Sequence, residues 1–241
     1  MIKFEHTVTP SPEQLMFVIE GMRNPMESWD QSDSGWIFTT DTDDIFTKRS
    51  FKLGTNDRDL MKRLCKAGSD ERKFMRQMPV MVRITAPLYW WKEFDTYKVG
   101  TVANSCSTMH KIHAKEFTLD DFSHEHLTEQ SRSILEDTIN LLNIHRVLFV
   151  SKNDKRVDAN TIMSDDCYAK YKKDLWWQMI QLLPSSYNQT RNITLNYEVL
   201  HNMYHARKHH KQDEWRVGFC DWCKSLPYSE LITEEWEESN E

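Results

Sequence analysis

The period of the hydrophobic positions changes along this chain of 241 residues. In PVMVRIT (79–85), valine and isoleucine occupy every second position, which is typical of a strand with one buried face. Apolar residues then fall at helical spacing in TEQSRSILEDTINLLNIH (128–145), and the short apolar run RVLFV (146–150) predicts a second strand. Two further stripes at helical spacing cover 168–182 and 215–226. The pattern therefore predicts a protein of mixed strands and helices.

The last two stripes are rich in aromatic residues. In 215–226, the steps of four, three and four residues join Trp215, Phe219, Trp222 and Leu226. Residues at this spacing cover one face of a helix. We therefore expect them to form a core or a subunit interface rather than a platform for a cofactor.

The chain shows no boundary between domains. Its six glycines and seven prolines form no low-complexity linker. We therefore expect a single domain over residues 1–241, with irregular segments near 24–36 and 151–166. The acidic end, from about residue 232 to residue 241, is expected to fray.

Composition and charge exclude several classes of function. Hydrophobic residues make up 39% of the chain, enough to bury a core, whereas the net charge of −6 argues against binding a nucleic acid polymer. The net charge does not exclude a free nucleotide as ligand, because binding one needs only a local basic pocket. Apolar runs such as VLFV (147–150) are far shorter than the roughly 20 residues of a membrane span. We expect a soluble, cytoplasmic protein without a membrane partner, whose five cysteines are mostly reduced thiols.

Two features raise the question of a zinc site. Cys220 and Cys223 form a Cys-x-x-Cys pair, and a histidine follows at every fourth position in a helix-like segment, at His201, His205 and His209. The cysteines lie within an amphipathic helix, and no second cysteine pair completes four ligands, so we expect no metal. The histidines are expected to form a polar helix face, or else to contact an anion or another subunit.

The segment EFDTYKVGTVANSCSTMHK (93–111), which follows the predicted strand, is crowded with hydrogen-bonding side chains. Polar groups that are taken out of water without a partner cost free energy, so this segment is poorly suited to a core. It is well suited to lining a pocket for a polar ligand. Cys106 lies within it, and because no base is evident beside it, we expect a small packed thiol rather than a nucleophile.

A second polar segment, 183–216, intersperses asparagine and arginine with apolar residues. A solvated helix face explains the charges but not the asparagines, which have low helix propensity. Helical spacing would place Asn196, Arg207 and His210 along one stripe. These three residues are therefore candidates for a binding site.

The order LP…T-x-N-x-x-x-L…R…H-x-Q-x-E-x-R in this second segment resembles the C-terminal half of the flavin-dependent thymidylate synthases (ThyX). The residues that carry the resemblance are Leu183, Thr194, Asn196, Leu200, Arg207, His210, Gln212, Glu214 and Arg216. In those enzymes a strand runs into the signature R-H-R-x-x-S-x-N-E-x-S-x-R, and the segment 93–111 occupies that place. The signature positions read Tyr97, Lys98 and Val99 for Arg-His-Arg, Val102 for the first Ser, Asn104 for Asn, Ser105 for Glu, Ser107 for the second Ser and Met109 for the last Arg. The resemblance covers roughly residues 68–226.

This resemblance implies an α+β fold with an antiparallel sheet and long helices, assembled as a homotetramer. It implies an enzyme that transfers a one-carbon unit reductively from methylenetetrahydrofolate to dUMP or a related pyrimidine deoxynucleotide, with FAD as cofactor and NADPH as reductant. Two alternatives stay open. One is a flavin enzyme of the same fold that acts on another nucleotide, and the other is a noncatalytic nucleotide-binding or assembly protein.

The resemblance also implies roles for individual residues. The cofactor-binding set is Tyr97, Lys98, Asn104, Asn196, Glu198, Asn202 and His210. The substrate-binding set is Ser105, Ser107, Lys111 and Arg207. Arg207 is in addition the implied catalytic residue, because its guanidinium would stabilise the negative charge that develops on the pyrimidine. Glu198 stands where the family has a flavin-contacting arginine, and Lys98 or Lys111 would supply the positive charge that the missing arginines give a phosphate.

Overall fold

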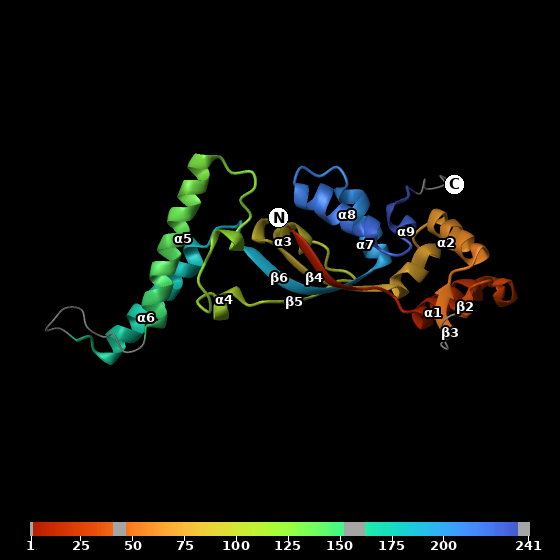
Figure 1. Cartoon of the computed structure of the whole chain (residues 1–241), viewed down its shortest axis with the longest axis horizontal. Coiled ribbons are helices and arrows are strands. Elements are labelled where there is room, and N and C mark those ends of the chain that lie inside the picture. Colours follow the sequence, from red (N-terminus) through yellow and green to blue (C-terminus); the bar gives the residue numbers. More distant parts are fainter. Residues whose placement is uncertain (1, 41–46, 152–161, 236–241) are drawn as a thin grey trace. The chain divides into compact units, whose positions relative to one another are not determined.

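The computed structural model describes residues 2–40, 47–151 and 162–235 (Figure 1). These residues form two compact units, each built from separate stretches of the chain. Unit 1 comprises residues 1–3, 84–96 and 104–191, and unit 2 comprises residues 4–83, 97–103 and 192–241. The chain therefore passes between the units several times, and the polar segment 93–111 is divided between them.

An antiparallel sheet of four strands has the order β1-β4-β6-β5. Its strands are β1 (Lys3–Val8), β4 (Pro79–Pro87), β5 (Val102–Ser105) and β6 (Asn188–Asn196). In β4 the side chains of Val80, Val82 and Ile84 are at most 3% exposed, whereas Met81 is 47% exposed. The predicted strand with one buried face is thus confirmed, because alternate side chains of a strand point to opposite faces.

Unit 1 is built around two long helices that pack against each other. Its helices are α3 (Leu88–Phe94), α4 (Thr108–Lys111), α5 (Glu129–Val150) and α6 (Asp165–Leu182). The hydrophobic core of this unit consists of Ile112, Phe117, Phe122, Leu135, Ile139, Leu142 and Met179. Both long helices begin at a hydroxyl cap, because the side chain of Thr128 accepts a hydrogen bond from the N–H of Ser131 and that of Ser164 from the N–H of Cys167.

The strand predicted over 146–150 is wrong, since these residues form the last turns of α5. Lys172 of α6 closes this end of the helix. Its Nζ donates to the carbonyl oxygens of Leu148 (2.6 Å), Phe149 (2.9 Å) and Ser151 (2.7 Å). A cation that binds the otherwise unpaired carbonyls at a helix C-terminus favours continued helix over an isolated strand.

Unit 2 contains most of the remaining elements. They are α1 (Pro12–Arg23), α2 (Thr55–Ala67), α7 (Tyr197–Arg207), α8 (Cys220–Ser225), α9 (Glu230–Thr233), the 3-10 helices Asn24–Met26, Trp29–Gln31 and Glu71–Gln77, the π-helix Glu214–Phe219, and the antiparallel pair β2 (Gly35–Thr40) and β3 (Thr47–Lys52). The predicted irregular segment 24–36 is thus made mainly of short 3-10 turns, and most of the other, 151–166, lies outside the described residues.

The aromatic stripe 215–226 lies in the core of unit 2. Trp215 and Phe219 are fully buried and Trp222 is 8% exposed, and the ring of Trp222 stacks on that of Phe4 at 4.7 Å between centroids. The expectation that these residues form a core is therefore confirmed.

The start of the acidic C-terminal segment is held in place. Ile232 is fully buried, Glu234 forms an ion pair with Lys62 (2.8 Å), and Glu235 forms one with Lys208. The predicted fraying therefore does not apply to residues 232–235. Residues 236–241 lie outside the described residues.

Candidate functional site

The structure divides the candidate residues between the two units. Unit 2 holds Tyr97, Lys98, Asn196, Glu198, Asn202, Arg207 and His210. Unit 1 holds Asn104, Ser105, Ser107 and Lys111. The expectation that the strand runs directly into the polar segment is wrong, because α3 follows β4 and already includes residues 93 and 94.

Arg207, the last residue of α7, is held by two aromatic side chains. Its Nε donates a hydrogen bond to the phenolic oxygen of Tyr97 (2.8 Å). Its guanidinium carbon lies 5.5 Å from the ring centroid of Tyr97 and 5.1 Å from that of Trp215. Cation–π contacts of this kind favour the charged side chain in one orientation. The fold thus brings Tyr97 and Arg207 together, and the guanidinium of Arg207 is held in one orientation. Trp215 also contributes to this orientation, although the sequence analysis assigned it only to the core.

Asn196 begins α7 as its N-cap. Its Oδ1 accepts a hydrogen bond from the N–H of Val199 (3.0 Å), which is the reason an asparagine suits this position. The predicted stripe from Asn196 to His210 on one helix is wrong, because Asn196 ends β6 and α7 stops at Arg207. His210 lies beyond the helix, and its Nδ1 accepts from the N–H of Gln212 (3.1 Å).

The loop that carries Tyr97 and Lys98 lies directly against the first turn of α7. Gly100 in this loop has φ +74°, and a Cβ added there would stand 2.9 Å from Cγ2 of Val199 and 3.3 Å from Nδ2 of Asn196. Only glycine accepts both this backbone conformation and this close approach without strain. The loop therefore places Lys98 near the N-terminal end of α7, which Asn196 caps.

Glu198 is occupied by two arginines within unit 2. Its carboxylate accepts from Nε and Nη2 of Arg76, the second at 3.1 Å, and lies 3.8 Å from Nε of Arg72. Glu198 is only 9% exposed, and these two arginines neutralise its charge. The pair joins the 3-10 helix Glu71–Gln77 to α7.

The candidates in unit 1 are more exposed. Asn104 and Ser105 lie on β5, and Lys111 ends α4. Ser107 is the N-cap of α4, where its Oγ accepts from the N–H of His110 (3.1 Å). Cys106, which lies between Ser105 and Ser107 in the sequence, is exposed, so the prediction of a packed thiol is wrong.

Arg191 of β6 is a second oriented guanidinium, which the sequence analysis did not select. It donates to Asp95 (2.6 Å) and to Oε1 of Gln189 (2.9 Å), and it lies 4.2 Å from the ring centroid of Trp91. All four residues belong to unit 1. The carboxylate of Asp95 balances the charge of this guanidinium.

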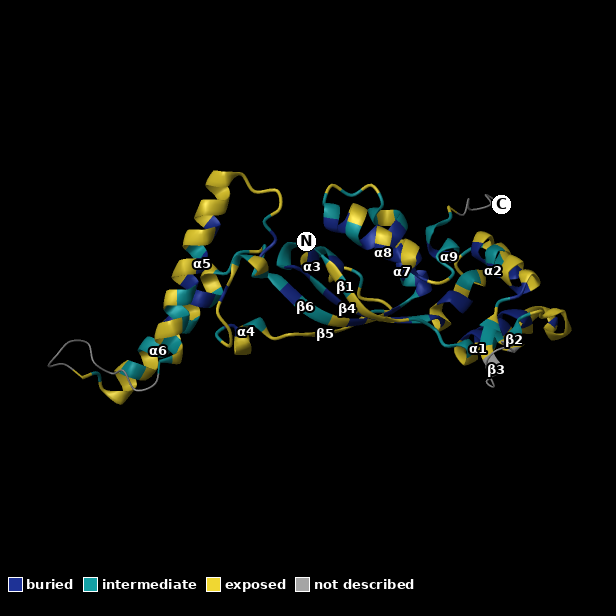
Figure 2. Cartoon of the chain, viewed as in Figure 1, coloured by how far each residue is buried: buried dark blue, intermediate teal, exposed yellow. Residues whose placement is uncertain are grey.

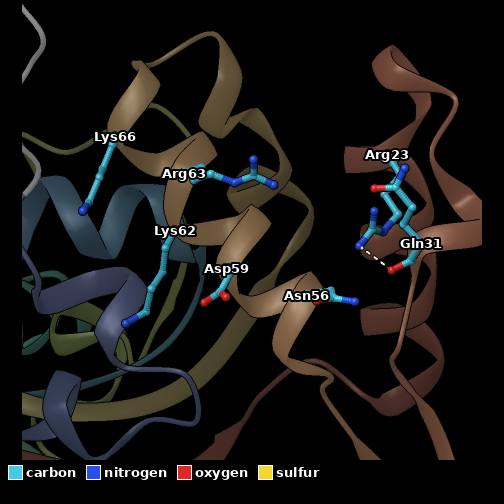
Figure 3. Close-up of a pocket in the computed structure, with 7 residues that line it drawn as sticks. All are labelled: Arg23, Gln31, Asn56, Asp59, Lys62, Arg63 and Lys66. Carbon is cyan, nitrogen blue, oxygen red and sulfur yellow. Dashed lines mark hydrogen bonds between the residues drawn. The ribbon is translucent and has the colours of Figure 1, made fainter.

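Two cavities are lined by none of the candidate residues. One, of about 690 Å³ in unit 2, is lined by Arg23, Gln31, Asn56, Asp59, Lys62, Arg63 and Lys66 (Figure 3). The other, of about 490 Å³ in unit 1, is lined by Lys3, Thr85, Lys115, Asp120, Asp121, Phe122, His124, Glu125, Asn188 and Thr190. In the first, Arg23 is paired with Asp57 and Lys62 with Glu234, so much of its positive charge is balanced within the protein.

The histidine ladder is partly a packing feature rather than a polar face. His201 is 7% exposed, its Nδ1 lies 3.2 Å from the carbonyl oxygen of Ile232, and its ring centroid lies 4.4 Å from that of His205. Burial, with the charges of His205 and Arg72, lowers the pKa of His201 to about 4. His209 alone of the three is exposed.

We predict that the Cys220 and Cys223 pair holds no metal. Both side chains are at most 2% exposed, and burial raises the pKa of both thiols, which disfavours the thiolate that zinc requires. In the described part of the chain, no three His, Cys, Asp or Glu side chains gather as metal ligands would. Metal analysis of protein purified without an affinity tag is expected to find no stoichiometric zinc, and one zinc per chain would contradict this.

Within the described residues, no helix combines the length and apolar character needed to cross a membrane. No protein-family model matches the sequence, and no curated protein matches it either.

Solved structures, in contrast, are similar over nearly the whole chain. Flavin-dependent thymidylate synthase ThyX from Helicobacter pylori, complexed with FAD and dUMP, aligns with a TM-score of 0.59 and 13% identity over 97% of this chain and 99% of that chain. A second structure of the H. pylori enzyme with FAD and dUMP has a TM-score of 0.56 and 13% identity, covering 95% and 94%. The UMP/dUMP methylase PolB from Streptomyces cacaoi, bound with 5-Br dUMP, has a TM-score of 0.51 and 11% identity, covering 96% and 93%. The chain therefore has the α+β fold of the ThyX enzymes, with the antiparallel sheet and long helices that the sequence analysis expected.

Proposed function

We propose that this protein is a flavin-dependent enzyme that transfers a one-carbon unit reductively to dUMP or a related pyrimidine deoxynucleotide. The observation that carries the proposal is Arg207, held between Tyr97 and Trp215 in a chain with this fold. A guanidinium whose orientation is set before the reaction can stabilise negative charge that develops on a pyrimidine without the cost of reorganisation.

The residues around the start of α7 fit an acceptor-rich cofactor such as FAD. Within the described residues, the amide nitrogens of Asn196 and Asn202 and the ammonium of Lys98 have no hydrogen-bond or ion-pair partner. A flavin presents ring nitrogens and carbonyl oxygens, and its phosphates are anionic, so these donors suit it. We propose that they hold FAD together with Tyr97, His210 and Asn104, whereas the ion-paired Glu198 serves to anchor α7.

When bound, FAD would supply the hydride chemistry, with NADPH as reductant and methylenetetrahydrofolate as carbon donor. The side chains of Ser105 and Ser107 would contact the nucleotide, and Lys98 or Lys111 its phosphate. We further propose that residues 1–241 act as one domain, because the similarity to ThyX spans both units, and that the enzyme is a cytoplasmic homotetramer.

A second candidate is a flavin enzyme of this fold that acts on a different nucleotide. The replacement of Arg-His-Arg by Tyr97, Lys98 and Val99 favours it, because the lysine cannot reproduce the bidentate contacts of arginine with phosphate. The similarity to the UMP/dUMP methylase PolB supports the same reading. The third candidate function is that of a noncatalytic nucleotide-binding protein with this fold.

The first test is flavin binding. Freshly purified protein is expected to be yellow, with absorption in the flavin bands, or to bind added FAD with a rise in melting temperature and quenching of flavin fluorescence. Riboflavin, which lacks the phosphates, is the matched control and should bind more weakly. Colourless protein that responds to FAD in neither assay would remove both enzyme proposals. In protein that does bind FAD, titration with dUMP, UMP and dCMP then separates the first candidate from the second.

A further inference from the structure

Two histidines of α7 pack against the C-terminal segment 226–235. His201 is 7% exposed, and the ring centroids of His201 and His205 are 4.4 Å apart. Nδ1 of His201 lies 3.2 Å from the carbonyl oxygen of Ile232, so the neutral ring donates a proton to the segment. Nε2 of His205 is buried and has no hydrogen-bond partner within the described residues. Buried positions accordingly recur along α7 in Figure 2.

The segment 226–235 is held at the end of the chain by a short helix. Leu231 and Ile232 of α9 are at most 1% exposed, and α9 has only four residues. This helix contacts α7, α2 and α8, which all belong to unit 2. The hydroxyl of Tyr197 also donates to the carbonyl oxygen of Pro227. A short segment at a chain terminus is the part of a fold that opens locally at the lowest cost in free energy.

The carboxylates around the two histidines are already neutralised. Arg72, which lies 3.8 Å from the carboxylate of Glu198, adds a further positive charge near the rings. The ring of Tyr204 covers His205 on another side, with 5.3 Å between the centroids. Three carboxylates lie near the pair, and each of them has a cationic partner: Glu198 with Arg76, Glu234 with Lys62 and Glu235 with Lys208. A proton gained by either histidine would therefore add an unbalanced charge in a buried place.

Burial accordingly lowers the pKa of both histidines. For His201 it does so together with the charges of His205 and Arg72, and the pKa is about 4. For His205, burial and the charge of Lys208 outweigh the carbonyl contacts with the segment and the charge of Glu235. When the segment leaves, both rings return to water and to an ordinary pKa of about 6.5. The contribution of the neutral pair to docking is thus fully present above pH 6.5 and is lost as the pH falls toward 4.

We propose that the segment 226–235 is a pH-dependent cover on α7, which is docked while His201 and His205 are neutral and is released when they gain protons. Release hydrates the charged rings, and a chain terminus can leave without unfolding the core of unit 2. The cover lies on the helix that Asn196 caps and Arg207 ends. It concerns unit 2 alone and holds whether or not the proposed reaction is correct.

Hydrogen–deuterium exchange measured by mass spectrometry tests the cover. The amides of Ile232, Thr233 and Glu234 donate within the turn of α9 and should be protected at pH 7.5. Their protection, corrected for intrinsic exchange rates, should fall by about 30-fold between pH 7.5 and pH 5, because docking lowers the pKa of His201 from 6.5 to about 4. The amides of β4 should stay protected. No loss at residues 232–234, or an equal loss in β4, would overturn the proposal.

Neutral side chains in place of the two histidines should remove the response. In the double variant His201→Asn, His205→Gln, both amides stay uncharged and keep a donor, so the protection should be the same at pH 7.5 and pH 5. His209→Gln is the matched control, because His209 belongs to the same ladder but is exposed, and this variant should respond as the wild type does. A double variant that still loses its protection at pH 5 would contradict the assignment.

Nuclear magnetic resonance of the wild-type histidine rings does not depend on how the double variant folds. The ring signals of His201 and His205 should change over the same pH range, below 6.5, in which residues 232–234 lose their protection. If the ring of His201 gained its proton while these amides stayed protected, the histidines would not control the cover and the proposal would be wrong.

Discussion

Replacing Asp57 with alanine is expected to lower the free energy of unfolding by about 3–5 kcal/mol, because it removes one partner of a buried ion pair. Asp57 is fully buried, and one of its carboxylate oxygens accepts from Nε of Arg23 (2.7 Å). The other accepts from the hydroxyl of Ser32 (2.8 Å) and the N–H of Ser34 (3.0 Å). The substitution leaves the guanidinium of Arg23, which is 3% exposed, without its counter-charge.

Asp59→Ala is the matched control for this prediction. Asp59 lies on the same helix but is exposed, so its loss should change the free energy of unfolding by no more than about 0.5 kcal/mol. Chemical denaturation followed by circular dichroism measures both variants. Equal, small effects in the two would show that the Arg23–Asp57 pair does not stabilise unit 2. In the double variant Arg23→Ala, Asp57→Ala, the loss should be smaller than the sum of the two single losses.

The same carboxylate gives the stability a defined dependence on pH. Burial acts to raise the pKa of Asp57, but hydrogen bonds from Ser34, Ser32 and Arg23, with the charge of Arg23, outweigh it and hold the pKa below 3.8. A depressed pKa in the folded state means that this contribution is fully present above pH 3.8 and is lost as the pH falls below it. The Asp57→Ala variant should not show that loss.

Arg207→Ala is expected to weaken nucleotide binding by roughly 10- to 150-fold with the fold intact, since a buried contact with a charged donor contributes about 1.5–3 kcal/mol. Calorimetry with dUMP and with deoxyuridine measures it. Because Arg207 is proposed to contact the base, both ligands should lose affinity by the same factor. Tyr97→Phe, which removes only the acceptor for Nε of Arg207, should give a smaller loss.

Three further variants make this prediction specific. Arg216→Ala is the matched control, because the side chain of Arg216 is 51% exposed and pairs with Asp213 on the surface. This variant should bind both ligands with the wild-type affinity. At least one of Lys98→Ala and Lys111→Ala should lose affinity for dUMP but not for deoxyuridine, because the lysines are proposed to contact the phosphate. Unchanged affinity in Arg207→Ala would remove Arg207 from the proposed site.

Elements whose apolar period repeats over many residues were predictable from the amino-acid sequence alone. The alternation in 79–85 predicted β4, and the stripes in 128–145, 168–182 and 215–226 predicted helices that the structure confirms. These predictions succeed because the period of the apolar residues states which face of an element is buried, and that information is local.

The conformation of the short run 146–150 and the partners of the charged residues depend on tertiary packing. A five-residue apolar run fits a strand or a helix, and Lys172 of the neighbouring helix settles it as helix by binding the last carbonyls. Likewise, Arg207 and Tyr97 are 110 residues apart, so no local pattern could pair them. Which polar groups meet depends on how distant segments pack, and the period of a sequence carries no record of that packing.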